Sequence, residues 1–413
     1  MGMLKRILKA LLPKAAIGAY HYALAVFSAF LYRQPSEKMI VIGVTGTSGK
    51  STTCYLLARA LEACRARVGM ASTILFKVGE KEKLNDKKMT MVGRFQLQKL
   101  LRNMVDAGCT YAIVETTSEG IVQHRHAGIH YDVCVFTNLY PEHIESHGSF
   151  DAYKAAKLKL FAKLACDPHK VVDGERVEKI IVVNAEDAQA LAFSSFAVDE
   201  VVGVFPSKQM LALKMLGVHN QSNAQLALAV GVSLGFDPHK LEQAICVVPG
   251  VPGRLEMIDE GQHFTVIVDY AFEPGALTKL YDTVESLKHK RIIHLTGSAG
   301  GGRDKARRAK IGALVAERAD VMIVTNEDPY DEDPQAIMDE VAAGAKRVPS
   351  EKRAEIRLML DRGEAIRSAI REARTGDLVL VTGKGSEQAM AVAGGKLAPW
   401  DDREEVRKAL RRL

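Results

Sequence analysis

The sequence is short of cysteine, of internal repeats and of any strong excess of one charge, and each shortage excludes a class of protein. Its six cysteines form no Cys-x-x-Cys pair, which excludes the usual zinc and redox motifs and a disulfide framework. The net charge of +6 suits an anionic ligand such as a nucleotide, but it is too small and too dispersed for nucleic-acid binding. A reducing cytoplasm and an ordinary globular composition fit best.

Eight short apolar runs, separated by helical patterns, predict the fold. They are β-branched and apolar along their length, as strands of a parallel sheet buried on both faces are. The runs are 39–45, 111–116, 133–138, 179–184, 265–270, 291–297, 320–326 and 377–383. The stretch CVVPGVPGR at 246–254 is typical of a linker. We predict an α/β protein with an N-terminal helical segment (1–38), a central domain (39–248) and a Rossmann-like C-terminal domain (249–413).

The run TGTSGKSTT follows the first predicted strand and precedes a helical pattern. Gly46 and Gly49 allow the tight turn that points backbone N–H groups at a phosphate. Lys50 is positioned to reach the β- and γ-phosphates of ATP, and Ser51 or Thr52 to offer a hydroxyl to Mg²⁺. The spacing Gly-x-x-Gly-Lys-Ser is shorter than the common loop, yet strand, loop and helix come in the right order. The sequence therefore predicts a P-loop ATPase-like central domain with a mainly parallel sheet.

Two later strands end in residues that suit the same site. Glu115 ends a strand beside the predicted loop, where a carboxylate can hold Mg²⁺ directly or through water. Asn138 closes the next strand, and Glu142 and His143 follow on a loop. His147 is either a further ligand or, as we favour, a turn residue. A single glutamate at a strand end is more often an exposed acid, so the metal site depends on these residues together.

The N-terminal segment is first basic and then apolar. Residues 4–12, LKRILKALL, predict an amphipathic helix of the kind that lies on an anionic membrane surface. Residues 15–32 carry no charge and approach the lower length limit of a transmembrane helix. A single span is disfavoured, because the ATP site must face the cytoplasm and the more positive N-terminal flank should stay there too. Two interpretations remain open: a helix that packs on the central domain, and a surface-lying or hairpin membrane anchor.

Several motifs, taken in order, closely resemble the Mur ligase family. They are VTGTSGKSTT, ETTSEGIVQHRHAG, FTNLYPEHIESHGSFDAYKAAKLKLF, LGVHNQSNAQLALAV, GRLEMID, VDYAFEPGAL, GGGRDKARRAKIG, TNEDPYDEDP and TGKGSEQ. The resemblance covers about residues 39–410 and is greatest to members that add the third residue of the peptidoglycan stem peptide. It implies a ligase in which ATP phosphorylates a peptide carboxylate. An amino acid's amine then attacks the acyl phosphate, which gives an amide, with ADP and phosphate as by-products.

The resemblance also implies roles for individual residues. Around ATP it places Gly46, Thr47, Gly49, Lys50, Ser51, Thr52, Asn138, Asn220, Asn223, Arg254 and Asp269. It implies two Mg²⁺ ions, held by Ser51, Glu115, His143 and a Lys157 that carries a carbamate formed from CO₂. It places Ser118, Gln123 and Arg125 against the muramoyl peptide, and Arg303, Gly383 and Glu387 against the incoming amino acid. The catalytic residues would be Lys50, Glu115, His143 and Lys157.

The chain departs from the family's pattern in four places. Only 38 residues precede the first predicted strand, whereas the family has a domain there that grips uridine diphosphate, so this contact is lost or made differently. Tyr330 stands where diaminopimelate-adding members have an Arg, and Tyr cannot pair bidentately with a distal carboxylate. The acidic run 331–333 hints at a cationic side chain on the incoming amino acid, although for the individual carboxylates we favour a solvated loop. Phe272 and Glu119 stand where His is usual.

Three hypotheses remain. The leading one is a cytoplasmic ligase that joins an amino acid to a muramoyl peptide, with or without peripheral membrane contact through residues 1–32. The second keeps the chemistry but uses a lipid-linked muramoyl peptide or a folate- or polyamide-type acceptor. The third is a nucleotide-binding regulator without ligase activity, which does not need a carbamate on Lys157. The sequence leaves the incoming amino acid and the oligomeric state open.

Overall fold

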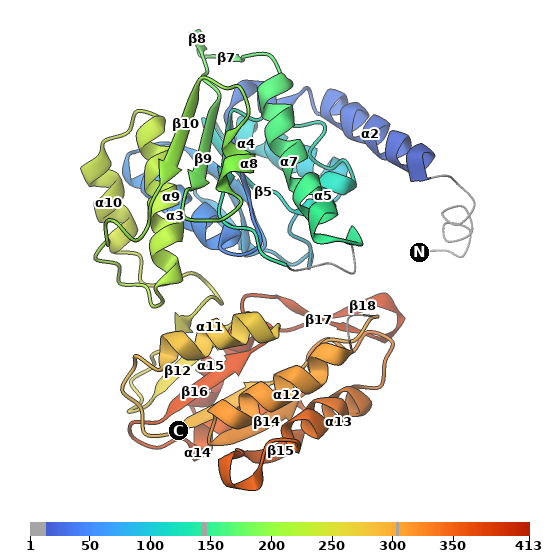
Figure 1. The fold of residues 1–413 in the computed structure, drawn as a ribbon, viewed down its shortest axis with the longest axis vertical. Coiled ribbons are helices and arrows are strands. Elements are labelled where there is room, and N and C mark those ends of the chain that lie inside the picture. Colours follow the sequence, from blue (N-terminus) through green and yellow to red (C-terminus); the bar gives the residue numbers. More distant parts are fainter. Residues whose placement is uncertain (1–13, 142–146, 303–304) are drawn as a thin grey trace. The chain divides into compact units, whose positions relative to one another are not determined.

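The chain forms two compact units in the computed structural model, which describes residues 14–141, 147–302 and 305–413. The first unit holds most of the chain up to Val248. The second unit comprises Pro249–Leu413 together with two short pieces, Leu84–Lys88 and Met215–Val218. Each unit is an α/β structure with its own sheet (Figure 1).

The first unit is built on an eight-stranded sheet in the order β10-β9-β6-β1-β5-β2-β3-β4. The strands are β1 (Ile40–Thr45), β2 (Val68–Ala71), β3 (Leu75–Val78), β4 (Lys81–Leu84), β5 (Tyr111–Glu115), β6 (Val133–Phe136), β9 (Ile180–Asn184) and β10 (Glu200–Val204). All pairings from β10 to β2 are parallel, and β2 pairs with β3 antiparallel. Because β1 lies between β5 and β6, the carboxyl ends of these three strands meet at one edge of the sheet.

Helices cover this sheet on both faces (Figure 1). They are α2 (Lys14–Leu31), α3 (Lys50–Ala63), α4 (Arg94–Asp106), α5 (Ser118–Val122), α7 (Phe150–Cys166), α8 (Ala190–Ser194), α9 (His219–Ser233) and α10 (Pro238–Cys246). Helices α3, α9 and α10 contact one another, whereas α4 and α7 pack on a core that includes Val41, Val114 and Phe136. A 3-10 turn, η1 (Pro35–Lys38), and a hairpin of β7 (Val171–Val172) and β8 (Glu175–Arg176) complete the unit.

The second unit has a six-stranded sheet in the order β11-β12-β16-β13-β14-β15. Its elements are β11 (Glu256–Met257), β12 (Thr265–Asp269), α11 (Pro274–Val284), β13 (Ile292–Thr296), α12 (Ala306–Arg318), β14 (Val321–Thr325), α13 (Pro334–Ala345), η2 (Ser350–Lys352), β15 (Glu355–Met359), α14 (Arg362–Glu372), β16 (Leu378–Thr382), β17 (Ala389–Val392), η3 (Ala393–Gly395), β18 (Lys396–Pro399) and α15 (Asp402–Leu410). Alternate residues of β16 enter two different cores: Leu378 and Leu380 pack with α11–α13, and Val379 and Val381 with α14 and α15. The sheet is therefore buried on both faces.

The predicted α/β fold with mainly parallel sheets is confirmed, and each of the eight predicted apolar runs contains a strand. The uncharged stretch 15–32 coincides with α2 except at its ends, and this helix packs on α4. No helix in the described part of the chain is both long and apolar enough to cross a membrane. The amphipathic helix predicted at 4–12 lies outside the described residues.

Candidate active site at the phosphate loop

The loop between β1 and α3 has the tight geometry that its glycines predict. Gly46 and Gly49 have positive φ angles of 152° and 80°. A Cβ atom on Gly46 would lie 1.9 Å from Thr137 Oγ1, and one on Gly49 would lie 2.2 Å from Asn223 Oδ1. Both positions therefore exclude any larger residue, because neighbouring side chains press directly against the backbone.

Asn138 holds the loop in place from the end of β6. Its side-chain oxygen Oδ1 accepts a hydrogen bond from the Ser48 backbone N–H at 3.0 Å, and its backbone oxygen accepts one from the Thr47 N–H at 2.8 Å. From α9, Asn223 lies against Gly49 and also receives a hydrogen bond from Thr53 Oγ1 at 3.5 Å. The loop conformation is thus fixed from two sides.

Lys50 is the first residue of α3 and folds back over the loop. Its Nζ atom donates to the backbone oxygens of Thr47 at 2.7 Å and Gly46 at 3.1 Å. The ammonium group therefore lies beside the loop, where a bound phosphate would meet it, and its charge adds to the partial positive charge of the α3 N-terminus.

Glu115, at the end of β5, meets the first turn of α3. Its Oε1 accepts a hydrogen bond from Ser51 Oγ at 2.9 Å, and its Oε2 accepts from the Thr73 backbone N–H at 2.7 Å and from Thr73 Oγ1 at 3.0 Å. Both Glu115 and Ser51 are buried. A carboxylate and a hydroxyl oxygen side by side are ligands that Mg²⁺ prefers, so these two residues fit a magnesium site. Thr52, the next residue of α3, is buried beside them.

Lys157 lies at the same loop, although its helical spacing alone suggests an exposed surface lysine. It is 1% exposed, and its Nζ donates to the Gly46 backbone oxygen at 2.7 Å. The ammonium also lies 4.5 Å from the centre of the Tyr153 ring, and the Tyr153 hydroxyl donates to Thr47 Oγ1 at 3.2 Å. Helix α7 therefore brings a buried amine and a phenol to the loop that holds Lys50.

The three residues expected to contact a muramoyl peptide lie on and just after α5. Ser118 is buried, and its Oγ lies 3.0 Å from His147 Nε2. Gln123 Oε1 accepts a hydrogen bond from Arg125 Nη2 at 2.7 Å, and Arg125 also donates to the Met91 backbone oxygen. The histidine treated above as a turn residue is thus the direct partner of a candidate substrate-binding serine.

Two predicted site residues, His143 and Arg303, lie outside the described residues, as does Glu142. Within the described ranges, no three His, Cys, Asp or Glu side chains gather as a metal-binding group. The proposed magnesium ligands inside those ranges are one carboxylate, one hydroxyl and one lysine. Only the carboxylate is one of these four residue types.

In the second unit, the predicted nucleotide-binding residues surround the end of β12. Asp269 accepts hydrogen bonds from the backbone N–H groups of Leu255 and Ala271, both at 2.7 Å. The Arg254 guanidinium lies 4.0 Å from the centre of the Tyr270 ring. Arg254 and Tyr270 therefore place a planar cation against an aromatic ring at the carboxyl end of the sheet. Asn220 belongs to the first unit, where its Oδ1 accepts from Asn223 Nδ2 at 2.9 Å.

Glu387, expected to contact the incoming amino acid, belongs to a buried cluster of charges. Lys384 Nζ donates to Glu387 Oε2 at 2.5 Å and to Asp328 Oδ1 at 2.9 Å. Lys88 Nζ, from the short piece 84–88, lies 2.5 Å from Asp328 Oδ2 and 3.1 Å from Glu387 Oε2. Burial raises the pKa of Asp328, but Lys384 and Lys88 outweigh it and lower the pKa overall. Two carboxylates and two ammonium groups therefore balance one another in this cluster.

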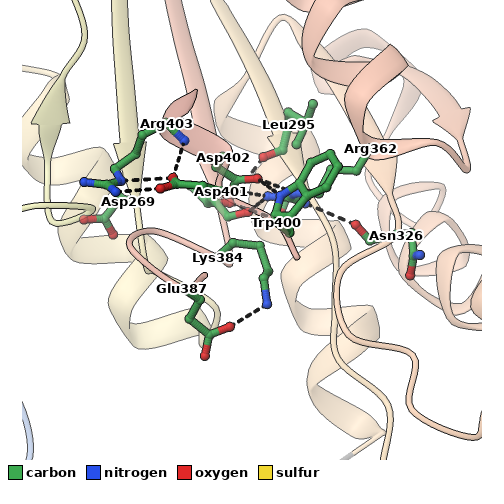
Figure 2. Close-up of polar contacts among 12 residues, drawn as sticks. Asp269, Leu295, Asn326, Arg362, Lys384, Glu387, Trp400, Asp401, Asp402 and Arg403 are labelled. Carbon is green, nitrogen blue, oxygen red and sulfur yellow. Dashed lines mark hydrogen bonds and ion pairs between the residues drawn. The ribbon is translucent and has the colours of Figure 1, made fainter. Parts of the chain in front are cut away.

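A second buried ion pair fixes the loop that carries Glu387 (Figure 2). Arg362 forms a bidentate pair with Asp402, with both N–O distances at 2.7 Å, and it also donates to the Thr382 backbone oxygen at the end of β16 at 2.7 Å. Trp400 Nε1 donates to Asp402 Oδ1 at 2.8 Å. Gly383 follows directly with a φ of 107°, and a Cβ atom there would lie 2.5 Å from Glu327 Oε2. Burial, followed by the charge of Asp328, raises the pKa of that Glu327 carboxyl.

The acidic run after Tyr330 has structural partners. Asp331 Oδ1 accepts from the Gly394 N–H at 2.8 Å, Glu332 pairs with Arg308 at 2.9 Å, and Asp333 caps α13.

Sequence reasoning overlooked Thr73, Tyr153, Lys88 and Lys384 as site residues. The YKAAK spacing is the one signal that could have found Tyr153, because it places that ring one helical turn from Lys157.

Comparison with known proteins identifies the family. Residues 44–231 match the Mur ligase middle domain, and residues 253–385 match the Mur ligase, glutamate ligase domain. The chain therefore belongs to the Mur ligase family and is an ATP-dependent amide ligase that forms ADP. A relative named UDP-N-acetylmuramyl-tripeptide synthetase, from Roseiflexus sp. (strain RS-1), is 37% identical over 97% of this chain and 84% of its own length.

Solved structures share the fold. One, a UDP-N-acetylmuramoyl-L-alanyl-D-glutamate–2,6-diaminopimelate ligase, superposes with a TM-score of 0.61 at 24% identity, over 95% of this chain and 83% of its own. A Mycobacterium tuberculosis folylpolyglutamate synthase superposes with a TM-score of 0.65 at 17% identity, over 88% and 93%. At these identities the likeness establishes the fold alone. Mur ligases in general use ATP and Mg²⁺, which suits the loop and the Ser51–Glu115 pair.

Proposed function

We propose that this enzyme joins an amino acid to the peptide carboxylate of a muramoyl-peptide precursor in the cytoplasm, as a step of peptidoglycan stem-peptide synthesis. The observation that carries the proposal is the convergence of Lys50, Lys157 and the Ser51–Glu115 pair on one loop. The names of sequence relatives, among them the Roseiflexus tripeptide synthetase, supply the acceptor class.

Each side chain has a specific task in this reaction. Lys50 offsets the repulsion between the γ-phosphate of ATP and the attacking carboxylate, because its ammonium lies over the loop. Ser51 and Glu115 would hold one Mg²⁺, and Lys157, as a carbamate, would hold a second together with His143. Bound metal supplies charge neutralisation for phosphoryl transfer. The carboxylate then gains the phosphoryl group, ADP leaves, and the amine displaces phosphate to form the amide.

The carrier of the acceptor separates two versions of this proposal. A UDP-linked muramoyl peptide is the version that the relative's name supports. A lipid-linked muramoyl peptide is favoured by the exposed apolar face of α2 described below, and it would bring the enzyme to the inner face of the membrane. A folate- or polyamide-type acceptor is supported only by fold likeness.

The decisive test measures ADP release by the full-length protein with ATP, Mg²⁺, a muramoyl dipeptide in either carrier form, and a panel of amino acids. We expect ADP release that requires both the acceptor and an amino acid. Mass spectrometry of the product should show one adduct, whose mass identifies the acceptor and the amino acid that was added. Lys50→Met should lower turnover at least ~100-fold because it removes the charge opposite the γ-phosphate. Arg59→Ala, on the outer part of the same helix, is the matched control. ADP release that never depends on the acceptor would overturn the proposal.

A further inference from the structure

Helix α2 exposes several of its large apolar side chains to solvent, whereas the residues that it buries fully are small. Ala25, Ser28 and Ala29 are buried against the first unit. The exposed large side chains are Tyr20, Tyr22, Val26, Phe27, Phe30 and Leu31, which are 44–72% exposed. A helix that only covers a domain shows the opposite arrangement, with its large apolar residues facing the core.

These exposed residues form one continuous surface. At ~100° per residue, the six positions fall within an arc of about 180°. The alanines at 16, 19 and 23 lie within the same arc and are also exposed. No charged residue interrupts it, because the sequence has none between Lys14 and Arg33. A contiguous exposed apolar surface of this size marks an interaction site rather than ordinary scattered exposure.

Basic residues predominate in the sequence around this helix. Before Glu37 the sequence contains no acidic residue but five basic ones, at Lys5, Arg6, Lys9, Lys14 and Arg33. On neighbouring elements, Arg94 lies close enough to Tyr20 to interact electrostatically, and Lys159 does the same with His124, whose ring packs edge-on against Tyr22. The nearby acid Asp106 is neutralised by its ion pair with Arg102.

We infer that α2 docks the enzyme on an anionic lipid bilayer, with Tyr20, Phe27 and Phe30 among the side chains that enter the boundary between headgroups and acyl chains. An apolar face with basic flanks matches the chemistry of such a surface. Basic residues near an anionic leaflet are attracted to it electrostatically. A second copy of the chain is a poorer partner, because the same positive flank on both copies would repel. Lipid contact would bring the phosphate-loop site to a membrane-borne acceptor, but the docking itself does not depend on the ligase reaction.

Vesicle flotation of the full-length protein tests this inference. We expect the protein to float with vesicles that contain both phosphatidylglycerol and phosphatidylcholine, and to bind them less at high salt. It should bind little to vesicles of pure phosphatidylcholine. The double variant Val26→Glu/Phe30→Glu changes exposed side chains only and should weaken binding at least ~30-fold, by loss of apolar burial and by charge repulsion. Leu191→Glu, which makes the same change at a residue 81% exposed on α8, should bind like the unchanged protein.

Three results would overturn the inference: no flotation with anionic vesicles, equal flotation of the double variant, or a dimer in solution that this variant dissociates while vesicles bind nothing. ADP release with a soluble acceptor, measured in parallel, tests the ligase proposal independently of membrane binding. The double variant should retain that activity, because neither residue belongs to the phosphate-loop site. Loss of ligase activity in every sample would contradict the proposed function and leave the flotation result standing.

Discussion

The Nζ atom of Lys157 lies 2.7 Å from the backbone oxygen of Gly46, so a lysine from the middle of α7 contacts the first residue of the phosphate loop. Five strands, β2 to β6, lie between the two residues in the sequence, so only the fold brings them together. A buried amine beside a phosphate loop has lost its hydration and is held by a carbonyl oxygen and the face of an aromatic ring. Both contacts fix the position of the Lys157 amine at the loop.

If Lys157 carries a carbamate, then Lys157→Ala should reduce kcat at least ~100-fold by removing a carboxylate from the metal site. Added formate or acetate should restore part of the activity, because a small carboxylate can occupy the space that the side chain leaves. ADP-release assays with and without these anions measure both effects. Lys159→Ala, an exposed neighbour on the same helix, should behave like the unchanged protein. A fully active Lys157→Ala enzyme would exclude the carbamate.

Glu115→Gln should raise the Mg²⁺ concentration needed for half-maximal activity by at least ~10-fold, because an amide oxygen is a weaker ligand for a hard cation than a carboxylate. The amide keeps the size of the side chain and can still hydrogen-bond Ser51, so folding should change little. Magnesium titrations of ADP release at saturating ATP provide the measurement. Glu119→Gln, at an exposed glutamate on α5, is the matched control. An unchanged magnesium requirement in Glu115→Gln would remove this carboxylate from the metal site.

Lys88 competes with any cation that Asp328 and Glu387 bind, because its Nζ lies within 3.1 Å of both carboxylates. On the proposed role of Glu387, Lys88→Met should lower the KM for lysine or ornithine by ~10-fold, since only Lys384 then remains as an internal ammonium at the two carboxylates. The KM for a neutral amino acid should stay the same. Lys87→Met, at an exposed neighbouring lysine, controls for charge. Equal effects on basic and neutral amino acids would show that these carboxylates do not select a cationic side chain.

His294 is fully buried, and burial lowers its pKa from 6.5 to about 3. Below pH 6.5 the unfolded chain therefore binds a proton that the folded chain does not, and the free energy of unfolding falls as pH decreases towards 3. Above pH 6.5 the group has no effect. Between pH 6.5 and 5 the loss is about 2 kcal/mol. Its ring bonds the Tyr281 hydroxyl at 2.6 Å and Thr382 Oγ1 at 2.9 Å, so the neutral ring is well held.

Urea unfolding at pH 7 and pH 5 measures this effect. His294→Asn should be less stable at pH 7, because it loses packing, but its stability should fall less between the two pH values. His263→Gln, at an exposed position of the same unit, should show the pH dependence of the unchanged protein. The assignment fails if His294→Asn and the unchanged protein lose the same free energy on acidification.

Long apolar strands and the glycine loop were predictable from sequence because local composition decides them. The strand at Ile40–Thr45 is uniformly apolar, and the turn after it requires Gly46. By contrast, β4 (Lys81–Leu84) has three exposed residues and no apolar pattern, so only its neighbour in the sheet defines it. Strand β10, in which Val201 and Gly203 are exposed, was also missed.

The candidate site was only partly predictable, because most of its contacts join distant segments. Lys157 carries no local mark of burial; its contact with Gly46 spans more than a hundred residues, and only the family resemblance selected it. The role of Lys88 could not be predicted from sequence, because its partner Asp328 lies far from it in the chain. The exposed face of α2 was predictable as apolar, but which of its sides meets solvent depends on packing against α4.

The order of strands in the first unit has a consequence for synthesis on the ribosome. The glycine loop leaves the sheet at β1, yet its shape depends on Asn138 after β6 and on Asn223 in α9. A nascent chain that ends before α9 therefore lacks the contacts of Asn223 with Gly49 and Thr53, and it should not retain nucleotide. Such long-range closure is slow relative to local helix formation, so nucleotide capture should be a late event in the maturation of this polypeptide.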